Sequence, residues 1–132
     1  MQNWCVPFRT GEIELPYGKM TLTVFHSNSE NTQKIYKQFS DHAVDYDKIK
    51  GTILIRNKRD GDSLSLAKRH VTKKIKKIFN EDHIPPDKRA YLPLITDNNA
   101  VVWLAGYGTD RNYQVTQNTE NILVVEFEEN DK

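Results

Sequence analysis

The sequence has little that could cross-link the chain or carry it into a membrane. Cys5 is the single cysteine among 132 residues, so no disulfide can form within the chain. No apolar run approaches the roughly 18 residues that a membrane helix needs. The first residues, MQNWCVPFRTGEIELP, lack the basic end followed by an apolar stretch that marks a secretory signal. These absences favour a protein of the reducing cytoplasm.

The sequence also lacks the motifs of common catalytic and metal centres. Its six glycines form no phosphate-cradling loop. No neighbouring base is evident that would activate Cys5 as a nucleophile. The histidines are scattered, and none has another histidine or a cysteine at the spacing of a metal site. We therefore predict no catalytic residue and no metal ligand. The four histidines are His26, His42, His70 and His83.

Charge is distributed unevenly along the chain, although the formal net charge is only +1. Between Arg56 and Lys77, nine basic residues stand against Asp60 and Asp62, which leaves a balance of +7 in this segment and −6 in the rest of the chain. A locally basic segment on a nearly neutral protein indicates a binding surface for a polyanion. The nine residues are Arg56, Lys58, Arg59, Lys68, Arg69, Lys73, Lys74, Lys76 and Lys77.

The segment from residue 71 to residue 79 predicts a short amphipathic helix with Thr72 as its N-cap. Four lysines crowd into the five positions that follow Thr72. Lysines three or four positions apart on a helix repel one another, by about a few tenths of a kcal/mol for each pair. Positive charge in the first turn of a helix is unfavourable as well. The apolar side would consist of Val71, Ile75, Ile78 and Phe79, and the basic side of Lys73, Lys74, Lys76 and Lys77.

A helix whose lysines repel one another is suited to binding phosphates, which neutralise that charge. A solvated basic face is the ordinary alternative for a run of like charges, and the lysines alone do not decide between the two. The other basic residues of the segment favour a surface for RNA or another polyanion.

The remaining sequence predicts an α+β domain with a mostly antiparallel sheet or sandwich, on which the short basic helix packs. Alternating polar and apolar residues predict a hairpin over residues 12–25. We place a boundary near residue 45. Short helices are expected at residues 33–44 and 86–92, a turn at Asp97, Asn98 and Asn99, and strands at residues 52–56, 63–67, 92–97, 100–106, 113–116 and 121–128.

Several motifs follow one another in an order that is typical of one family. DYDKIKG is followed by LIRNKRDGDSL, by KKIKKIFNEDHIPPDKRAYLPLI, and then by VVWLAG and YQVT. From Asp45 to Phe127 the chain resembles the C-terminal domain of bacterial tRNA(Ile)-lysidine synthetases. We assign residues 45–132 to this domain and residues 1–44 to a hairpin and short helix that precede it.

The resemblance implies a compact α+β sandwich related to a domain of phenylalanyl-tRNA synthetase. It also implies a parent enzyme, an ATP-dependent ligase that joins lysine to C2 of the wobble cytidine 34 in the CAU anticodon of tRNA(Ile). ATP and magnesium would belong to the N-terminal catalytic domain of that enzyme. This chain is therefore expected to need no cofactor, to be inactive alone, and to hold the acceptor region of the tRNA. Its expected partners are tRNA(Ile) and the catalytic domain, with no membrane partner.

Ten basic residues are the candidates for contacts with RNA. Between Asp62 and Lys73 the family usually has an arginine, a proline and glycines, whereas this chain has SLSLAKRHVT. Pro86, Ala90 and Gly108 also depart from the family pattern. These differences concern the detailed contacts with tRNA and leave the expected fold unchanged. The candidates are Lys73, Lys74, Lys76, Lys77, Arg89, Arg56, Lys58, Arg59, Lys68 and Arg69.

Two other functions fit a basic surface of this kind. One is a free-standing module that binds nucleic acids in general. The other is a protein-interaction domain whose basic face meets an acidic partner, or the acidic tail of a second copy in a homodimer.

Overall fold

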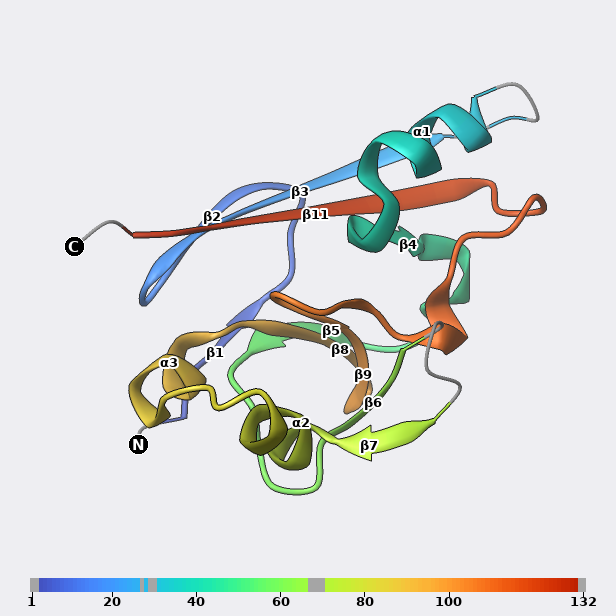
Figure 1. Cartoon of the computed structure of the whole chain (residues 1–132). Coiled ribbons are helices and arrows are strands. Elements are labelled where there is room, and N and C mark those ends of the chain that lie inside the picture. The colour runs from blue at the N-terminus through green and yellow to red at the C-terminus, as the bar shows by residue number, and fades with distance from the viewer. Residues whose placement is uncertain (1–2, 27, 29–30, 67–70, 131–132) are drawn as a thin grey trace.

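A computed structural model describes residues 3–26, 28, 31–66 and 71–130. Two sheets form separate layers, with helix α1 above one sheet and helices α2 and α3 beside the other (Figure 1). Every strand pairing within the described residues is antiparallel. The predicted α+β class with antiparallel sheets is therefore confirmed.

The first sheet has five strands in the order β1-β5-β8-β9-β10. Asn98 and Asn99 join β8 to β9 with φ angles of 47° and 74°. Two consecutive positive φ angles are typical of a type I′ hairpin turn, in which asparagine is favoured. The predicted turn is thus confirmed. The strands are β1 (Cys5–Pro7), β5 (Ile53–Arg56), β8 (Leu94–Asp97), β9 (Ala100–Leu104) and β10 (Gly108–Thr109).

The second sheet has four strands in the order β2-β3-β11-β4. Strands β2 and β3 form the predicted hairpin, and β11 pairs with β3 along all nine of its residues. Segments from both sides of residue 45 share this sheet. The strands are β2 (Gly11–Leu15), β3 (Gly18–His26), β4 (Ala43–Asp45) and β11 (Asn121–Glu129).

Strand β11 has four consecutive apolar residues because both of its faces are covered. Successive side chains of a strand point to opposite faces. Leu123 and Val125 belong to the main core, which contains residues of both sheets. Ile122 and Val124 belong to a smaller cluster that α1 (Thr32–Phe39) completes with Phe39. This strand therefore connects the two hydrophobic cores.

A third, two-stranded sheet leads into the basic helix. Strand β6 (Ser63–Ser65) pairs with β7 (Thr72–Lys74), and α2 (Ile75–Glu81) begins directly after β7. Helix α3 (Pro86–Tyr91) follows, with a proline in its first turn as expected. No helix in the part of the chain that the structure describes is long and apolar enough to span a membrane. Three 3₁₀ turns lie at Ser40–His42, Tyr46–Lys48 and Arg111–Tyr113.

The predicted start of the basic helix was wrong by two residues, since the N-cap is Lys74 and not Thr72. Thr72 is not an N-cap, because it lies in β7 opposite Ser65. Pairing with β6 satisfies the backbone of this segment, so it stays extended until Ile75. Val71 was assigned to the buried side of the helix, but its side chain is 51% exposed. Ile75, Ile78 and Phe79 are buried, as predicted.

Two further predictions of secondary structure were also wrong. The first helix ends at Phe39, and Val44 lies in β4, where β11 offers a strand to pair with. The expected strand at residues 113–116 is absent. Asp110 accepts a hydrogen bond from the Asn112 amide at 2.9 Å and starts a 3₁₀ turn there.

We expect Phe79→Ala to detach α2 from the core. The Phe79 side chain is completely buried, and truncation of a buried phenylalanine costs about 3–5 kcal/mol. Urea unfolding should show this loss in the free energy of unfolding. Lys77→Ala, on the exposed side of the same helix, should stay close to the wild type. Equal losses in the two variants would contradict the assigned orientation of α2.

Candidate nucleic-acid interface

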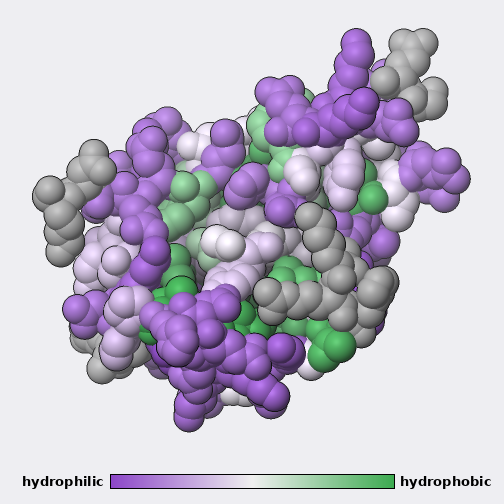
Figure 2. Space-filling view, in the orientation of Figure 1, coloured by the Kyte–Doolittle hydropathy of each residue, from purple (hydrophilic) through white to green (hydrophobic). Residues whose placement is uncertain are grey.

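Three lysines from two separate segments surround one pocket of about 280 Å³. Lys58 comes from the turn after β5, whereas Lys74 and Lys76 lie at the junction of β7 and α2. In Figure 2, which has the orientation of Figure 1, hydrophilic residues gather at the lower edge of the molecule, where α2 lies. We call this site the lysine pocket. Its lining residues are Lys58, Asp60, Gly61, Asp62, Lys74 and Lys76.

Backbone hydrogen bonds hold the two segments together. Ser63 is opposite Lys74 in the β6–β7 pair, and the Ile75 amide donates to the Asp62 carbonyl oxygen at 2.9 Å. Gly61 has a φ of +90°, which favours glycine at this tight turn. The turn and the helix start are therefore fixed next to each other, and the lysines of both face the same pocket.

The lysines face solvent because the apolar residues between them face the core. Ile75 is completely buried, and Lys74, Lys76 and Lys77 are exposed. These three lysines have no carboxylate within ion-pair distance among the described residues. Lys73 differs, since its ammonium group lies 2.9 Å from Glu81. The predicted run of four thus provides three unneutralised charges.

A buried ion pair supports the lysine pocket from within. Arg56 donates from Nη1 and Nη2 to the two carboxylate oxygens of Asp62, at 2.8 and 3.0 Å. The two side chains are only 5% and 7% exposed. The Arg59 amide donates to the same carboxylate at 2.7 Å. Arg56 was a candidate for RNA contact, but its guanidinium is inside the protein and committed to Asp62.

The pKa of Asp62 is lowered by its partners. Burial by itself would raise the pKa of this carboxyl. The hydrogen bonds from the Arg56 side chain and the Arg59 amide, with the positive charges of Arg56 and Lys58, outweigh burial and hold the pKa below its ordinary value. Asp62, which lines the lysine pocket, therefore remains ionised.

Arg89 also has a structural role. Its Nε donates to the Ile84 carbonyl oxygen at 2.6 Å, and Nη2 donates to the Phe79 carbonyl oxygen at 3.2 Å. Nη1 donates to Asn80 Oδ1 at 2.7 Å. The guanidinium carbon lies 5.8 Å from the centroid of the Phe79 ring. Arg89 thus completes the C-terminal end of α2 and connects it to α3.

The other candidates extend the lysine pocket to different degrees. Lys58 is 3.9 Å from Asp60, whose side chain is fully exposed, so solvent weakens this contact. Arg59 is half-buried and donates from Nη2 to the Trp4 carbonyl oxygen at 3.3 Å. Lys68 and Arg69 lie outside the described residues. The structure therefore brings together Lys58, Lys74 and Lys76, with Lys77 on the same helix.

The supporting role of Asp62 was not predicted from the sequence. Opposite charges six positions apart, Arg56 and Asp62, were the available signal, because a turn between them can bring such residues together. No group of three or more potential metal ligands occurs in the described part of the chain.

The fold is shared with two solved structures. A crystal structure of a TILS C-terminal domain matches with a TM-score of 0.81 and 18% identity, over 99% of this chain and all of that one. An N-terminal fragment of the phenylalanyl-tRNA synthetase β-subunit from Pyrococcus horikoshii matches with a TM-score of 0.58 and 18% identity, over 84% of this chain and 39% of that one. At such identities the likeness concerns the fold alone.

The sequence comparisons define the family. The family model described as the TilS substrate C-terminal domain matches residues 53–126, and this chain belongs to that family. It is 40% identical over 63% of its length to a tRNA(Ile)-lysidine synthase of Caldanaerobacter subterraneus, and 36% identical over 75% to one of Clostridium tetani. It covers 18% and 22% of those proteins, so it spans about a fifth of their length. The resemblance found in the sequence is confirmed.

We expect Asp62→Asn to destabilise the protein by about 3–5 kcal/mol at pH 7, because it leaves the buried Arg56 charge uncompensated. The folded-state pKa of Asp62 is lowered. Its contribution to stability is therefore present above about pH 4 and is lost as pH falls through the folded-state pKa. Urea unfolding at pH 7 and pH 3 should show a smaller pH dependence in the variant.

Asp60→Asn is the matched control for this experiment. Asp60 is two positions away but fully exposed, so its variant should keep the stability and the pH dependence of the wild type. An Asp62→Asn protein with wild-type stability and acid sensitivity would show that the Arg56–Asp62 pair does not support the turn.

Proposed function

We propose that this chain is a tRNA-binding domain and that the lysine pocket holds a backbone phosphate of tRNA. The observation that carries the proposal is the meeting of Lys58, Lys74 and Lys76 around a single pocket. Their charges repel one another in the free protein. A phosphate group would relieve this repulsion and accept hydrogen bonds from the ammonium groups.

The composition of the lysine pocket favours a phosphate over a base. Its lining contains no aromatic ring on which a base could stack and no amide side chain that could read a base edge. Lysine contacts to phosphates set position and affinity rather than sequence preference. We infer that the pocket positions the acceptor region of the tRNA and that any choice among tRNAs is made elsewhere.

Lys77 and Arg59 extend this surface, and Lys68 and Arg69 remain candidates. Lys73 contributes less, because Glu81 already neutralises it. Arg56 and Arg89 act indirectly, since each holds a segment that carries or supports the lysines. The proposed RNA surface is therefore narrower than the ten residues that the sequence suggested.

The proposal extends to the parent enzyme that the relatives represent. In that enzyme a separate catalytic domain, with ATP and magnesium, would ligate lysine to C2 of the wobble cytidine of tRNA(Ile) in the cytoplasm. The domain described here would hold the tRNA and take no part in the chemistry. The isolated chain should accordingly form no AMP from ATP in the presence of lysine, magnesium and tRNA(Ile). Formation of AMP above a no-protein blank would contradict this division of labour.

Binding is best tested by a fluorescence-anisotropy titration against tRNA(Ile) with the CAU anticodon, at several salt concentrations. We expect a log–log salt slope of about −3 or steeper, because each phosphate contact contributes about −0.9. An acceptor-stem minihelix should compete, and an anticodon stem-loop should compete poorly. Equal binding of unrelated duplexes would favour a general nucleic-acid module. A lack of RNA binding, with a mass that rises with concentration, would favour self-association.

Lys74→Ala/Lys76→Ala should weaken tRNA binding by roughly tenfold or more and make the salt slope shallower by about 2. Lys34→Ala/Lys37→Ala is the matched control. It removes the same charge from exposed positions of α1, on the other sheet, and should change binding by less than about threefold. Similar losses in both variants would mean that net charge, and not the lysine pocket, determines affinity.

A further inference from the structure

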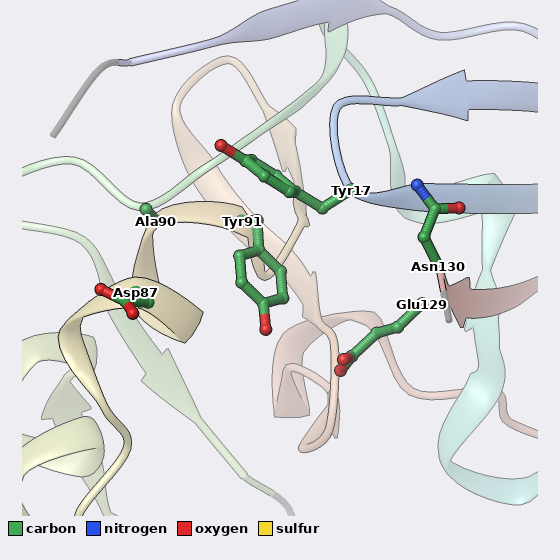
Figure 3. A pocket seen from close by; sticks show the side chains of 6 residues that line it. All are labelled: Tyr17, Asp87, Ala90, Tyr91, Glu129 and Asn130. Atoms are coloured by element: carbon green, nitrogen blue, oxygen red, sulfur yellow. The ribbon is translucent and has the colours of Figure 1, made fainter. Parts of the chain in front are cut away.

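A second pocket, of about 350 Å³, lies between the β2–β3 turn, helix α3 and the end of β11 (Figure 3). We call it the tyrosine pocket. It shares no lining residue with the lysine pocket, and its polar side chains include no lysine or arginine. Its lining residues are Tyr17, Asp87, Ala90, Tyr91, Glu129 and Asn130.

Two tyrosine rings form the aromatic part of this pocket. The ring centroids of Tyr17 and Tyr91 are 4.7 Å apart and their planes are inclined by 38°. Tyr17 remains 48% exposed, which leaves much of the ring open to a ligand. The backbone around the rings is fixed, since the Asn130 amide donates to the Tyr17 carbonyl oxygen at 3.0 Å. Trp4 Nε1 donates to the Ala90 carbonyl oxygen, also at 3.0 Å.

Two carboxylates accompany the rings. In the view of Figure 3, Tyr91 lies between Asp87 on one side and Glu129 on the other. Within the described residues Asp87 has no ion-pair partner. Glu129 is 3.7 Å from Lys88, but both side chains are about two-fifths exposed, so this contact is weak and a ligand can replace it. The tyrosine pocket is therefore negative and repels phosphates.

Aromatic faces and carboxylates together select a cation. A guanidinium fits best, because it is planar, is less strongly hydrated than an ammonium, stacks on aromatic rings and donates to carboxylates. The protein already holds one guanidinium in a related way, with carbonyl and amide oxygens in place of carboxylates. Arg89, on the same helix as Tyr91, lies over the Phe79 ring and donates to oxygen acceptors around it.

We propose that the tyrosine pocket binds the guanidinium of an arginine side chain presented by a protein segment. The carboxylates of Asp87 and Glu129 favour a basic protein segment over RNA, whose phosphates they would repel. A free arginine fits less well, because its own carboxylate would be repelled by Asp87 and Glu129. This proposal does not depend on the lysine pocket or on tRNA binding.

The test is an NMR titration of the ¹⁵N-labelled chain with N-acetyl-arginine amide. We expect saturable shifts that are concentrated on the backbone amides of Tyr17, Ala90, Tyr91 and Asn130. N-acetyl-citrulline amide, which has the same shape without the charge, should bind at least about tenfold more weakly. N-acetyl-lysine amide should bind more weakly than N-acetyl-arginine amide. Free arginine should also bind more weakly than N-acetyl-arginine amide.

Variants identify the groups that recognise the cation. Asp87→Asn and Glu129→Gln should each weaken the binding of N-acetyl-arginine amide by about three- to tenfold. Tyr17→Leu should weaken this binding as well. Glu126→Gln is the matched control, since it removes one negative charge from an exposed position of β11 outside the pocket. Its affinity should equal that of the wild type. The dispersed amide spectrum of each variant confirms that it is folded.

Four results would overturn the proposal. The first is an absence of saturable shifts at the tyrosine pocket. The second is equal affinity for the arginine and citrulline compounds, which would make the charge irrelevant. The third is preferential binding of adenosine, which would make the pocket a base-stacking site. The fourth is equal affinity for free arginine and N-acetyl-arginine amide, which would indicate that the ligand is a small molecule and not a protein segment.

Discussion

Asp62 lies where three segments of the chain meet, and it bonds to each of them. Its carboxylate accepts from the side chain of Arg56 at the end of β5 and from the amide of Arg59 in the turn. Its carbonyl oxygen accepts from the amide of Ile75, the first residue of α2. The strand, the turn and the helix are therefore positioned by one residue, and Lys58 of the turn is placed next to Lys74 and Lys76 at the start of the helix.

This arrangement explains how a nearly neutral domain can present a concentrated positive charge. Two arginines with fixed, directional donors have structural roles: the buried Arg56 satisfies a carboxylate, and the half-buried Arg89 satisfies carbonyl oxygens. Lysines, whose single charge ends a flexible stem, remain outside. Arg56 and Arg89 thus have fixed partners within the protein, whereas the exposed lysines of α2 can adapt to a ligand.

The sequence predicted elements that depend on local patterns. Alternation predicted the β2–β3 hairpin, and helical spacing predicted the buried side of α2. The extension of residues 72–74 could not be foreseen, because its cause is pairing with β6 and not any local preference. The burial of Arg56 was not predicted either, because it depends on the turn that brings Asp62, six positions away, back to the guanidinium. The predicted contacts with RNA and the boundary at residue 45 stay predictions.

The pairing of β11 with β3 has a consequence for the order of folding. β11 is the central partner of β3 and β4, yet it is synthesised about a hundred residues after β3. Until it arrives, β3 has one unpaired edge, and Met20 and Leu22 lack their cross-strand neighbours Phe127 and Val125. Contacts at such separation slow folding and leave unpaired edges open to wrong partners. During synthesis of the chain, the four-stranded sheet therefore stays incomplete until β11 has been made.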